Sequence, residues 1–319
     1  MHAGIRRVGA AFGASALAAV FSFAWPPPSA LAFVQSRTDN GSPASWRKTS
    51  VPLIAYSQAL PNMSSAQVTS AIQASVAAWT RANADVAKCS PLELPVTLAP
   101  ANEEAPTGAN DHKNVIALRL ADWEGICHAS GTGVLVCHQR EELALTTLFM
   151  TGSGKIVDAD IEVNAADYPW ADVPSTVSDE RLWDLQNALT HEVGHFVGVS
   201  HTCYWDLGEF PVDSNGDAKV PNNSSGKPVP FCGEASPAEV ASTMFPSADP
   251  RDLDKRSLEP DDVAGLCSIY PFPDGCGACA VTSGDGHLTD ARWQGSLAAL
   301  VASALMLVVR VRRRRRDLL

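Results

Sequence analysis

The sequence predicts one α+β domain over residues 46–273. Alternating apolar runs, typical of strands, fill the first half of this region, and a histidine-bearing segment with helical apolar spacing follows in the second half. The chain has no internal repeat. Strands first and a motif-bearing helix later favour the α+β class.

The first expected elements are a strand and a helix. Residues 53–57 are predicted to form the strand. Ser64 then begins a helix, because its side chain and that of Gln67 can form a reciprocal capping box. The apolar positions of this helix recur at helical spacing and should pack in the core: Val68, Ile72, Val76 and Trp79. A loop rich in Pro, Ala, Glu and Gly follows at residues 99–110.

Three strand-like runs and a long helix come next. Residues 115–120 (VIALRL) alternate in polarity, and residues 143–149 and 155–163 are β-like runs around the turn at residues 151–154. The helix is predicted from Ser178 to Val197. Its buried side should carry Leu182, Leu185, Leu189 and Val193.

The rest of the domain is expected to be an insertion and a last helix. The insertion is rich in loops and runs from Cys203 to about Ala238. The helix spans about Pro260 to Ile269, since proline suits the first turn, the two aspartates after it favour the positive end, and Pro271 stops it.

Both ends of the chain carry apolar segments outside this domain. Residues 1–32 resemble a secretory signal peptide that ends in a small-x-small cleavage site, with an uncut membrane anchor as the alternative. Residues 33–45 and 274–292 are expected to be linkers. Residues 293–319 combine an apolar run of membrane-spanning length with an arginine block that should stay cytoplasmic. We therefore expect an exported domain, either anchored at the cell surface or secreted after processing.

The exported part is strongly acidic. Residues 33–292 carry 16 Lys and Arg against 34 Asp and Glu, a net charge of −18. Such a surface argues against nucleic-acid binding and keeps a secreted protein soluble. We expect the chain to act as a monomer whose membrane contact is its C-terminal segment.

Eight cysteines in an exported chain permit disulfides. Cys127 and Cys137 are close enough to bridge a hairpin-like loop, and Cys203 and Cys232 bracket the insertion. Cys89 and Cys267 would be left to pair with each other, and Cys276 and Cys279 stand apart near the C-terminal apolar run. The sequence alone does not establish the third pairing.

The chemistry is expected in residues 191–201 (HEVGHFVGVSH). His191 and His195 lie four apart on the predicted helix, so both project from one face and can bind one tetrahedral Zn²⁺. Gly198 lets the chain leave the helix with a positive φ and turns His201 back towards the metal. Three protein ligands leave a fourth position for water, as catalytic zinc sites do.

Glu192 follows the first histidine and is expected beside the metal without being a ligand. Its carboxylate can accept a proton from water at the metal and return it to the leaving amine. Each fixed position of the motif has its own geometric reason, so an accidental arrangement of helix residues explains it poorly. The pattern therefore indicates amide hydrolysis without a covalent intermediate.

Residues 191–201 resemble the zinc signature of the metzincin metalloproteases. Residues 242–246 (STMFP) are similar to the Met-turn of that clan, in which Met244 would lie under the zinc. Pro246 resembles the matrixins, whereas astacin-like enzymes place a tyrosine ligand there. Residues 258–270 are similar to the final matrixin helix.

The resemblance covers about residues 46–272. It implies a zincin-like fold with a twisted mixed β-sheet, two long helices, an active-site cleft, and a smaller C-terminal subdomain with a final helix. It also implies protein or peptide substrates that pair, in extended form, with the backbone at Leu143 and Ala144. Leu145 stands where animal matrixins carry a histidine for a second, structural zinc, so one catalytic zinc is expected.

Two weaker resemblances leave alternatives open. Asp158, Asp160 and Glu162 align loosely with a matrixin calcium loop, and residues 213–217 (DSNGD) place oxygen atoms at alternate positions, but a polar strand face or a solvated turn explains them equally well. Residues 275–279 (GCGAC), the apolar run and the arginines resemble a myxobacterial C-terminal sorting segment. An ordinary disulfide before a membrane anchor is the alternative there.

The sequence thus predicts a zinc-dependent endopeptidase with Glu192 as general base. The rival hypothesis is a zinc-bearing surface or adhesion protein that is catalytically silent, and the presence of Glu192 favours the enzyme. A third hypothesis, a tethered protein with a structural zinc, needs a fourth protein ligand, for which Cys203 is the candidate.

Overall fold

The structure is a computed structural model that describes residues 33–100, 103, 105, 106, 110–129, 135–175 and 180–273. The expected signal peptide, the Cys276 and Cys279 pair and the C-terminal apolar run lie outside these residues. Among the described residues, no helix has both the length and the apolar character needed to cross a membrane.

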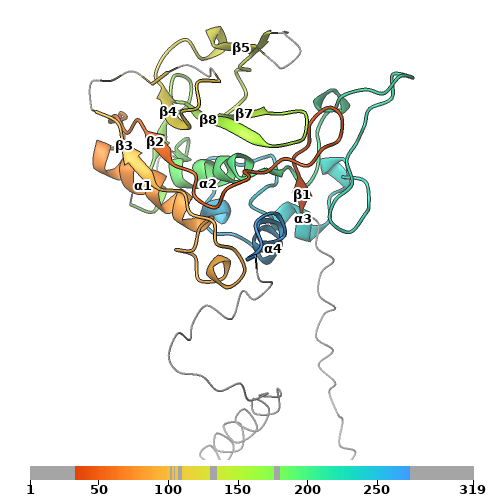
Figure 1. The fold of residues 1–319 in the computed structure, drawn as a ribbon. Coiled ribbons are helices and arrows are strands. Elements are labelled where there is room, and N and C mark those ends of the chain that lie inside the picture. Colours follow the sequence, from red (N-terminus) through yellow and green to blue (C-terminus); the bar gives the residue numbers. More distant parts are fainter. Residues whose placement is uncertain are drawn as a thin grey trace, which may run out of the picture. The chain divides into compact units, whose positions relative to one another are not determined.

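A five-stranded mixed sheet, in the order β3-β2-β4-β8-β7, forms the upper layer in Figure 1. Its strands are β2 (Leu53–Ala55), β3 (Val96–Leu98), β4 (Val115–Arg119), β7 (Ala144–Met150) and β8 (Ile156–Asn164). Four of them run parallel, and β7 pairs antiparallel with β8. The predicted strands, and with them the α+β class, are confirmed, whereas β3 was not anticipated.

Two helices pack against each other beneath this sheet, α1 (Ser65–Ala78) and α2 (Leu185–Phe196) (Figure 1). α1 begins as predicted, because Ser64 Oγ accepts the N–H of Gln67 and the Gln67 side chain accepts the N–H of Ser64. Its four predicted core residues are all buried. Trp79, just beyond its end, donates its indole N–H to the carbonyl of Thr190 at 2.7 Å and so ties α1 to the motif-bearing helix.

α2 begins later than the sequence predicts, at Leu185 instead of Ser178. Asp184 is its N-cap, and its Oδ1 accepts the N–H of Asn187 at 2.8 Å. A side chain that satisfies a free N–H of the first turn defines a start that apolar spacing alone does not show. Leu182 therefore lies before the helix, buried in a small separate cluster.

The remaining elements are short. They are β1 (Val34–Gln35), β5 (Cys127–Ala129), β6 (Leu135–Cys137), β9 (Trp170–Ala171), β10 (Trp183–Asp184), β11 (Val199–Ser200), α3 (Pro237–Ala241), α4 (Pro260–Ile269) and the 3₁₀ turns η1 (Val86–Lys88), η2 (Trp123–Gly125), η3 (Val173–Ser175), η4 (Leu207–Glu209), η5 (Cys232–Glu234) and η6 (Asp254–Arg256). β1 pairs with β11, β5 with β6, and β9 with β10. α4 has the predicted bounds.

Three disulfides fasten this framework. Cys127 bonds to Cys137, Cys203 to Cys232, and Cys89 to Cys267, with Cα–Cα distances of 3.9, 4.9 and 5.4 Å. All three expected pairings are confirmed, including the one that the sequence left open. The third joins η1 to α4 and therefore holds the C-terminal helix against the first half of the domain.

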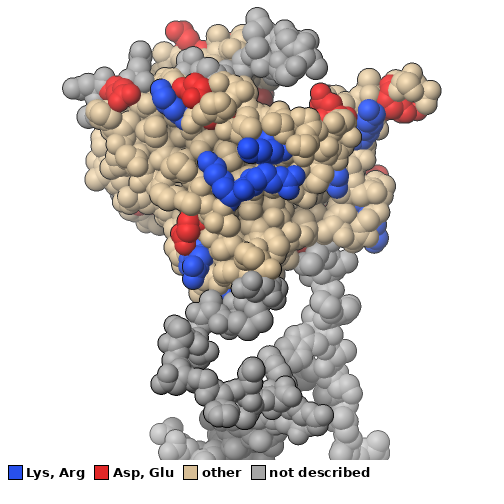
Figure 2. Space-filling model, in the orientation of Figure 1, with Lys and Arg blue, Asp and Glu red and all other residues tan. Residues whose placement is uncertain are grey.

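Charge is unevenly spread over the surface. On the face seen in Figure 2, Lys and Arg side chains gather near the middle, and the Asp and Glu side chains lie towards its margins. The net negative charge of residues 33–292 is thus not evenly distributed on this face.

Candidate metal centre

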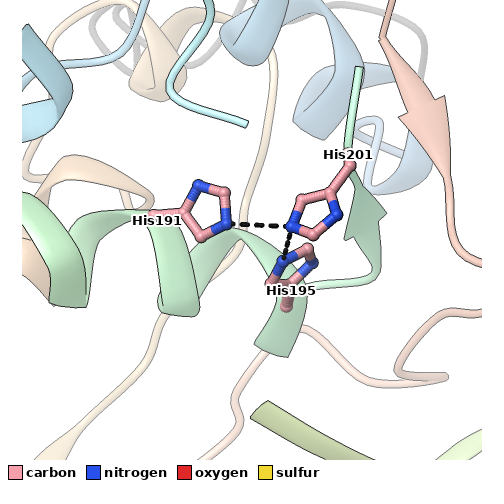
Figure 3. Close-up of side chains that lie close together, drawn as sticks. All are labelled: His191, His195 and His201. Carbon is pink, nitrogen blue, oxygen red and sulfur yellow. Dashed lines mark hydrogen bonds between the residues drawn. The ribbon is translucent and has the colours of Figure 1, made fainter. Parts of the chain in front are cut away.

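The three histidines of the motif converge on one point (Figure 3). His191 and His195 lie one turn apart on α2, and His201 follows β11. Nε2 of His201 lies 3.2 Å from Nε2 of His191 and 3.0 Å from Nε2 of His195. Within the described residues, this is the one group of three or more His, Cys, Asp or Glu side chains arranged closely enough to hold a metal ion.

The outer ring nitrogens of two of these histidines are held by backbone carbonyls. Nδ1–H of His191 donates to the carbonyl of Thr243 at 2.7 Å, and Nδ1–H of His195 donates to that of Val199 at 2.9 Å. A proton on Nδ1 leaves a lone pair on Nε2, so both rings direct an acceptor at His201. Converging lone pairs repel one another unless a cation lies between them.

The spacing also fits a tetrahedral metal. Zn–N bonds of about 2.0–2.1 Å at tetrahedral angles place two ligand nitrogens about 3.3 Å apart. The observed separations of 3.0 and 3.2 Å are close to this value. A tetrahedral ion held by three nitrogens would keep its fourth position for another ligand. The donor set therefore fits a zinc ion with one open position.

Burial keeps these imidazoles neutral. Desolvation is the largest cause that lowers the pKa of His195 to about 4 and the pKa values of His191 and His201 well below 6.5. Neighbouring histidines and the charge of Lys255 act in the same direction on His191 and His201. Neutral imidazole is the form that binds a metal, so the centre needs no deprotonation at neutral pH.

The turn after α2 brings the third histidine back. Gly198 has φ 89°, and its N–H donates to the carbonyl of His195 at 2.8 Å. A Cβ at this position would lie 2.9 Å from the backbone oxygen of Ala44, so a side chain here would be strained in both conformation and space. The chain then enters β11 and reaches His201, as the sequence predicts.

Met244 packs against the motif helix at Gly194. It is fully buried, and its carbonyl accepts the N–H of Thr202 at 3.2 Å. A Cβ on Gly194 would lie 2.2 Å from Met244 Sδ and 2.8 Å from the ring of Trp79. Position 194 therefore has to be glycine for this contact to exist.

The final helix reaches the metal centre through this same turn. Asp262 of α4 accepts the hydroxyl of Ser242 at 2.6 Å and the N–H of Thr243 at 3.0 Å. The carbonyl of Thr243 in turn accepts the ring N–H of His191. Asp262 is thus two hydrogen bonds from a candidate ligand, a role that its place at the start of the last helix does not indicate.

Glu192 lies beside the three histidines and is only 7% exposed. Burial raises the pKa of its carboxyl to about 7, and the hydrogen bond from Thr146 partly offsets this effect. The Thr146 hydroxyl donates to Oε2 at 2.6 Å. Thr146 belongs to β7, and no local pattern pointed to it.

One cavity of about 610 Å³ is lined by the expected general base, the three histidines expected to bind zinc and the two residues expected to contact the substrate. Its lining includes Leu143, Ala144, His191, Glu192, His195 and His201. The edge strand β7 and residues 245–248 both contribute to its lining. We call this cavity the cleft.

The carboxylates considered for calcium lie elsewhere. Asp158 and Asp160 each accept a backbone N–H, from His112 and Val115 respectively, and Glu162 pairs with Arg119 at 2.5 Å. In residues 213–217, one carboxylate oxygen of the first residue accepts two backbone N–H groups of the same turn. Calcium binding stays a prediction at both places.

Cys203 is bonded to Cys232 and is therefore not available as a thiolate ligand. The hypothesis of a closed, four-ligand structural zinc loses its one candidate for the fourth ligand. Within the described residues, no other His, Cys, Asp or Glu belongs to the group that could hold the metal, and the three histidines line the cleft.

Comparison with known protein families finds no family that matches this chain, and comparison with curated proteins finds no relative. The function therefore has to be inferred from the centre and the cleft themselves.

Proposed function

We propose that the chain is a zinc-dependent endopeptidase of the metzincin type, similar to the matrixins. The observation that carries this proposal is the convergence of three histidines, with Nε2 of His201 within 3.2 Å of Nε2 of both His191 and His195, beside a buried carboxylate in one open cleft. A purely structural site would instead close the fourth position with a protein ligand.

His191, His195 and His201 would hold the metal. A zinc ion bound there supplies a Lewis acid that polarises a substrate carbonyl and makes water a better nucleophile at neutral pH. The carbonyls of Thr243 and Val199 keep two of the ligand rings in the orientation that this binding needs.

Glu192 would move the proton. Its ionised carboxylate takes a proton from the attacking water and then delivers it to the nitrogen of the leaving amine. A pKa near 7 suits both transfers, because the group gives and takes a proton with little energetic penalty at neutral pH. Thr146 fixes Oε2 and leaves the other carboxylate oxygen for this exchange.

The edge strand would bind the substrate. β7 pairs with β8 on one side and with no other described strand on the other. An extended peptide can add to such an edge through main-chain hydrogen bonds, with little dependence on its side chains. Leu143 and Ala144 line the cleft at this edge, so a bound peptide would pass across the metal centre.

The wider proposal follows from the sequence. The catalytic domain would be exported, anchored at the cell surface through the C-terminal segment or released after processing, and its substrates would be proteins or peptides. The buried turn at Met244 and its contact with α4 support the similarity to matrixins.

The proposal is tested with the purified chain and its Glu192→Gln variant. Zinc content is measured by elemental analysis, and cleavage of unfolded casein is followed with and without a chelator. We expect one zinc per chain in both proteins, and cleavage that the chelator or the substitution abolishes. Glu124→Gln, an exposed residue of η2, is the matched control and should cleave like the parent.

Two results would count against the proposal. Stoichiometric zinc without cleavage of any substrate would favour the catalytically silent surface protein. A folded chain that binds no zinc would remove the basis of both hypotheses.

A further inference from the structure

The lining of the cleft includes one cation, Lys255 of η6. It is only 6% exposed. A buried lysine usually has a carboxylate partner, because the desolvated charge is otherwise costly. No described carboxylate forms an ion pair with this one, and its side chain meets uncharged groups instead.

Those groups are backbone carbonyls of the cleft wall. Lys255 Nζ donates to the carbonyl of Ser247 at 2.8 Å and also to that of Phe245. An ammonium has three N–H donors, so two are used and one remains for a ligand. Neutral dipoles thus hold the cation in place, while the charges of Asp252, Asp262, Glu192 and Asp254 act on it without forming an ion pair.

Lys255 also lies close to the metal centre. Its backbone N–H donates to Oδ1 of Asn187 at 2.7 Å, and Asn187 precedes His191 by one turn on the same face of α2. The cleft therefore runs from the histidines along α2 to the ammonium. The charge of Lys255 is near enough to lower the pKa of Glu192.

The neighbouring residue keeps this lysine in position. Arg256 donates to both carboxylate oxygens of Asp184, at 2.8 and 2.6 Å, and to Asp172 at 2.6 Å. Asp184 caps α2 and is itself buried. η6 is therefore fixed to the start of the motif helix, which holds the backbone of Lys255 beside the cleft.

We propose that the cleft selects substrates that place a carboxylate next to the scissile bond, and that Lys255 is the residue that determines this specificity. The inference rests on the proposed function. The carboxylate has two possible sources: an Asp or Glu side chain that directly flanks the bond, or the C-terminal carboxylate of a short peptide.

The charges of the other cleft residues are consistent with a binding position for a carboxylate beside Lys255. Glu141 and Glu142 also line it, but they come from the segment before β7, and neither pairs with Lys255. A substrate carboxylate would be repelled near them and attracted near the lysine. Burial lowers the pKa of Lys255 to about 8, so it is mainly protonated at pH 7.

The test compares otherwise identical peptides with Glu or Gln directly before or after the cleaved bond. The readout is the ratio of kcat/KM for Glu and Gln at pH 7, because a ratio does not depend on the fraction of active enzyme. We expect Glu to be preferred about tenfold or more at one of the two positions, as a charge-assisted hydrogen bond in a buried site allows.

In Lys255→Met the preference should fall to about one, and Lys255→Gln should repeat this result if the first variant folds poorly. Lys227→Met removes the charge of an exposed lysine in the insertion and is the matched control that should keep the preference. Peptides with a free or an amidated C-terminus distinguish the two sources of the carboxylate.

A second readout separates this inference from the proposed function. Fluorescent Glu and Gln peptides are titrated into the Glu192→Gln protein, and their affinities are compared with and without the Lys255 substitution. Cleavage with equal rates for Glu and Gln would overturn the inference and leave the endopeptidase standing. Absence of cleavage would count against the endopeptidase. The ratio of the affinities for the Glu and Gln peptides would then still test whether Lys255 binds a carboxylate.

Discussion

The hydroxyl of Thr146 lies 2.6 Å from Oε2 of Glu192 and 3.1 Å from the backbone carbonyl of the same residue. This contact joins the edge strand β7 to the motif helix α2 at the proposed general base. It favours the ionised carboxylate and opposes the effect of burial. The strand that would bind the substrate thus also holds the group that would transfer the proton.

Replacing Thr146 with valine should slow catalysis without removing the metal. The isosteric change deletes one hydrogen bond to a charged group, so we expect kcat/KM to fall about tenfold. The pKa of Glu192 should rise, which moves the acid limb of the pH profile to higher pH. Zinc content and the pH profile are measured beside Thr147→Val, which should match the parent. An unchanged profile would show that the hydroxyl does not act on the base.

Much of this centre follows from local sequence, and some of it does not. The three histidines, Glu192 and Gly198 stand within eleven residues, so helix geometry and one turn suffice to bring them together. The start of α2 was misplaced because apolar spacing continues upstream of the capping Asp184.

The supporting residues could not be found in this way. Thr146 is 46 positions from Glu192, and the carbonyl of Thr243 is 52 positions from His191. Such contacts depend on how β7, the turn and α4 pack around α2, which no local pattern encodes. The residue types gave little signal either, because a threonine on a strand is ordinary.

Gly194→Ala should destabilise the domain even though alanine is the better helix former. The new Cβ would meet Met244 Sδ at 2.2 Å and the Trp79 ring at 2.8 Å, and overpacking of this kind costs about 1–3 kcal/mol. Urea unfolding measures the loss. Gly125→Ala is the control, since its Cβ would meet only Asp122, at 3.8 Å. Equal stability for parent and Gly194→Ala would contradict the described packing.

Asp262→Ala should weaken zinc binding from a distance. The substitution frees the hydroxyl of Ser242 and the N–H of Thr243, both buried, which costs on the order of 3 kcal/mol of unfolding free energy. The Thr243 carbonyl then loses its fixed place beside His191, and zinc affinity should fall about 10- to 100-fold. Competition with a fluorescent chelator measures this affinity.

The control for that experiment is Asp249→Ala, which removes an exposed carboxylate near the same turn. Its zinc affinity and stability should equal those of the parent. A loss of stability in Asp262→Ala without any loss of zinc affinity would show that α4 supports the fold but not the metal centre.

Asp160→Asn should stabilise the domain at pH 8 more than at pH 4. The parent carboxyl is buried, and desolvation, helped by Asp158, raises its pKa from 3.8 to about 7. The native state therefore holds this proton more tightly than the unfolded chain, so its contribution to stability is full below about pH 4 and is lost as pH rises to about 7. Asparagine does not ionise, and its Oδ1 can still accept the N–H of Val115.

Thermal melts of parent and variant at pH 4, 6 and 8 measure this difference. We expect nearly equal melting temperatures at pH 4 and a gap of several degrees at pH 8, with Asp249→Asn as the exposed control. A gap that does not grow with pH would mean that Asp160 titrates normally. Repeating the pH 8 melts with Ca²⁺ tests the calcium prediction as well, because an ion bound at Asp160 would stabilise the parent and leave the variant unchanged.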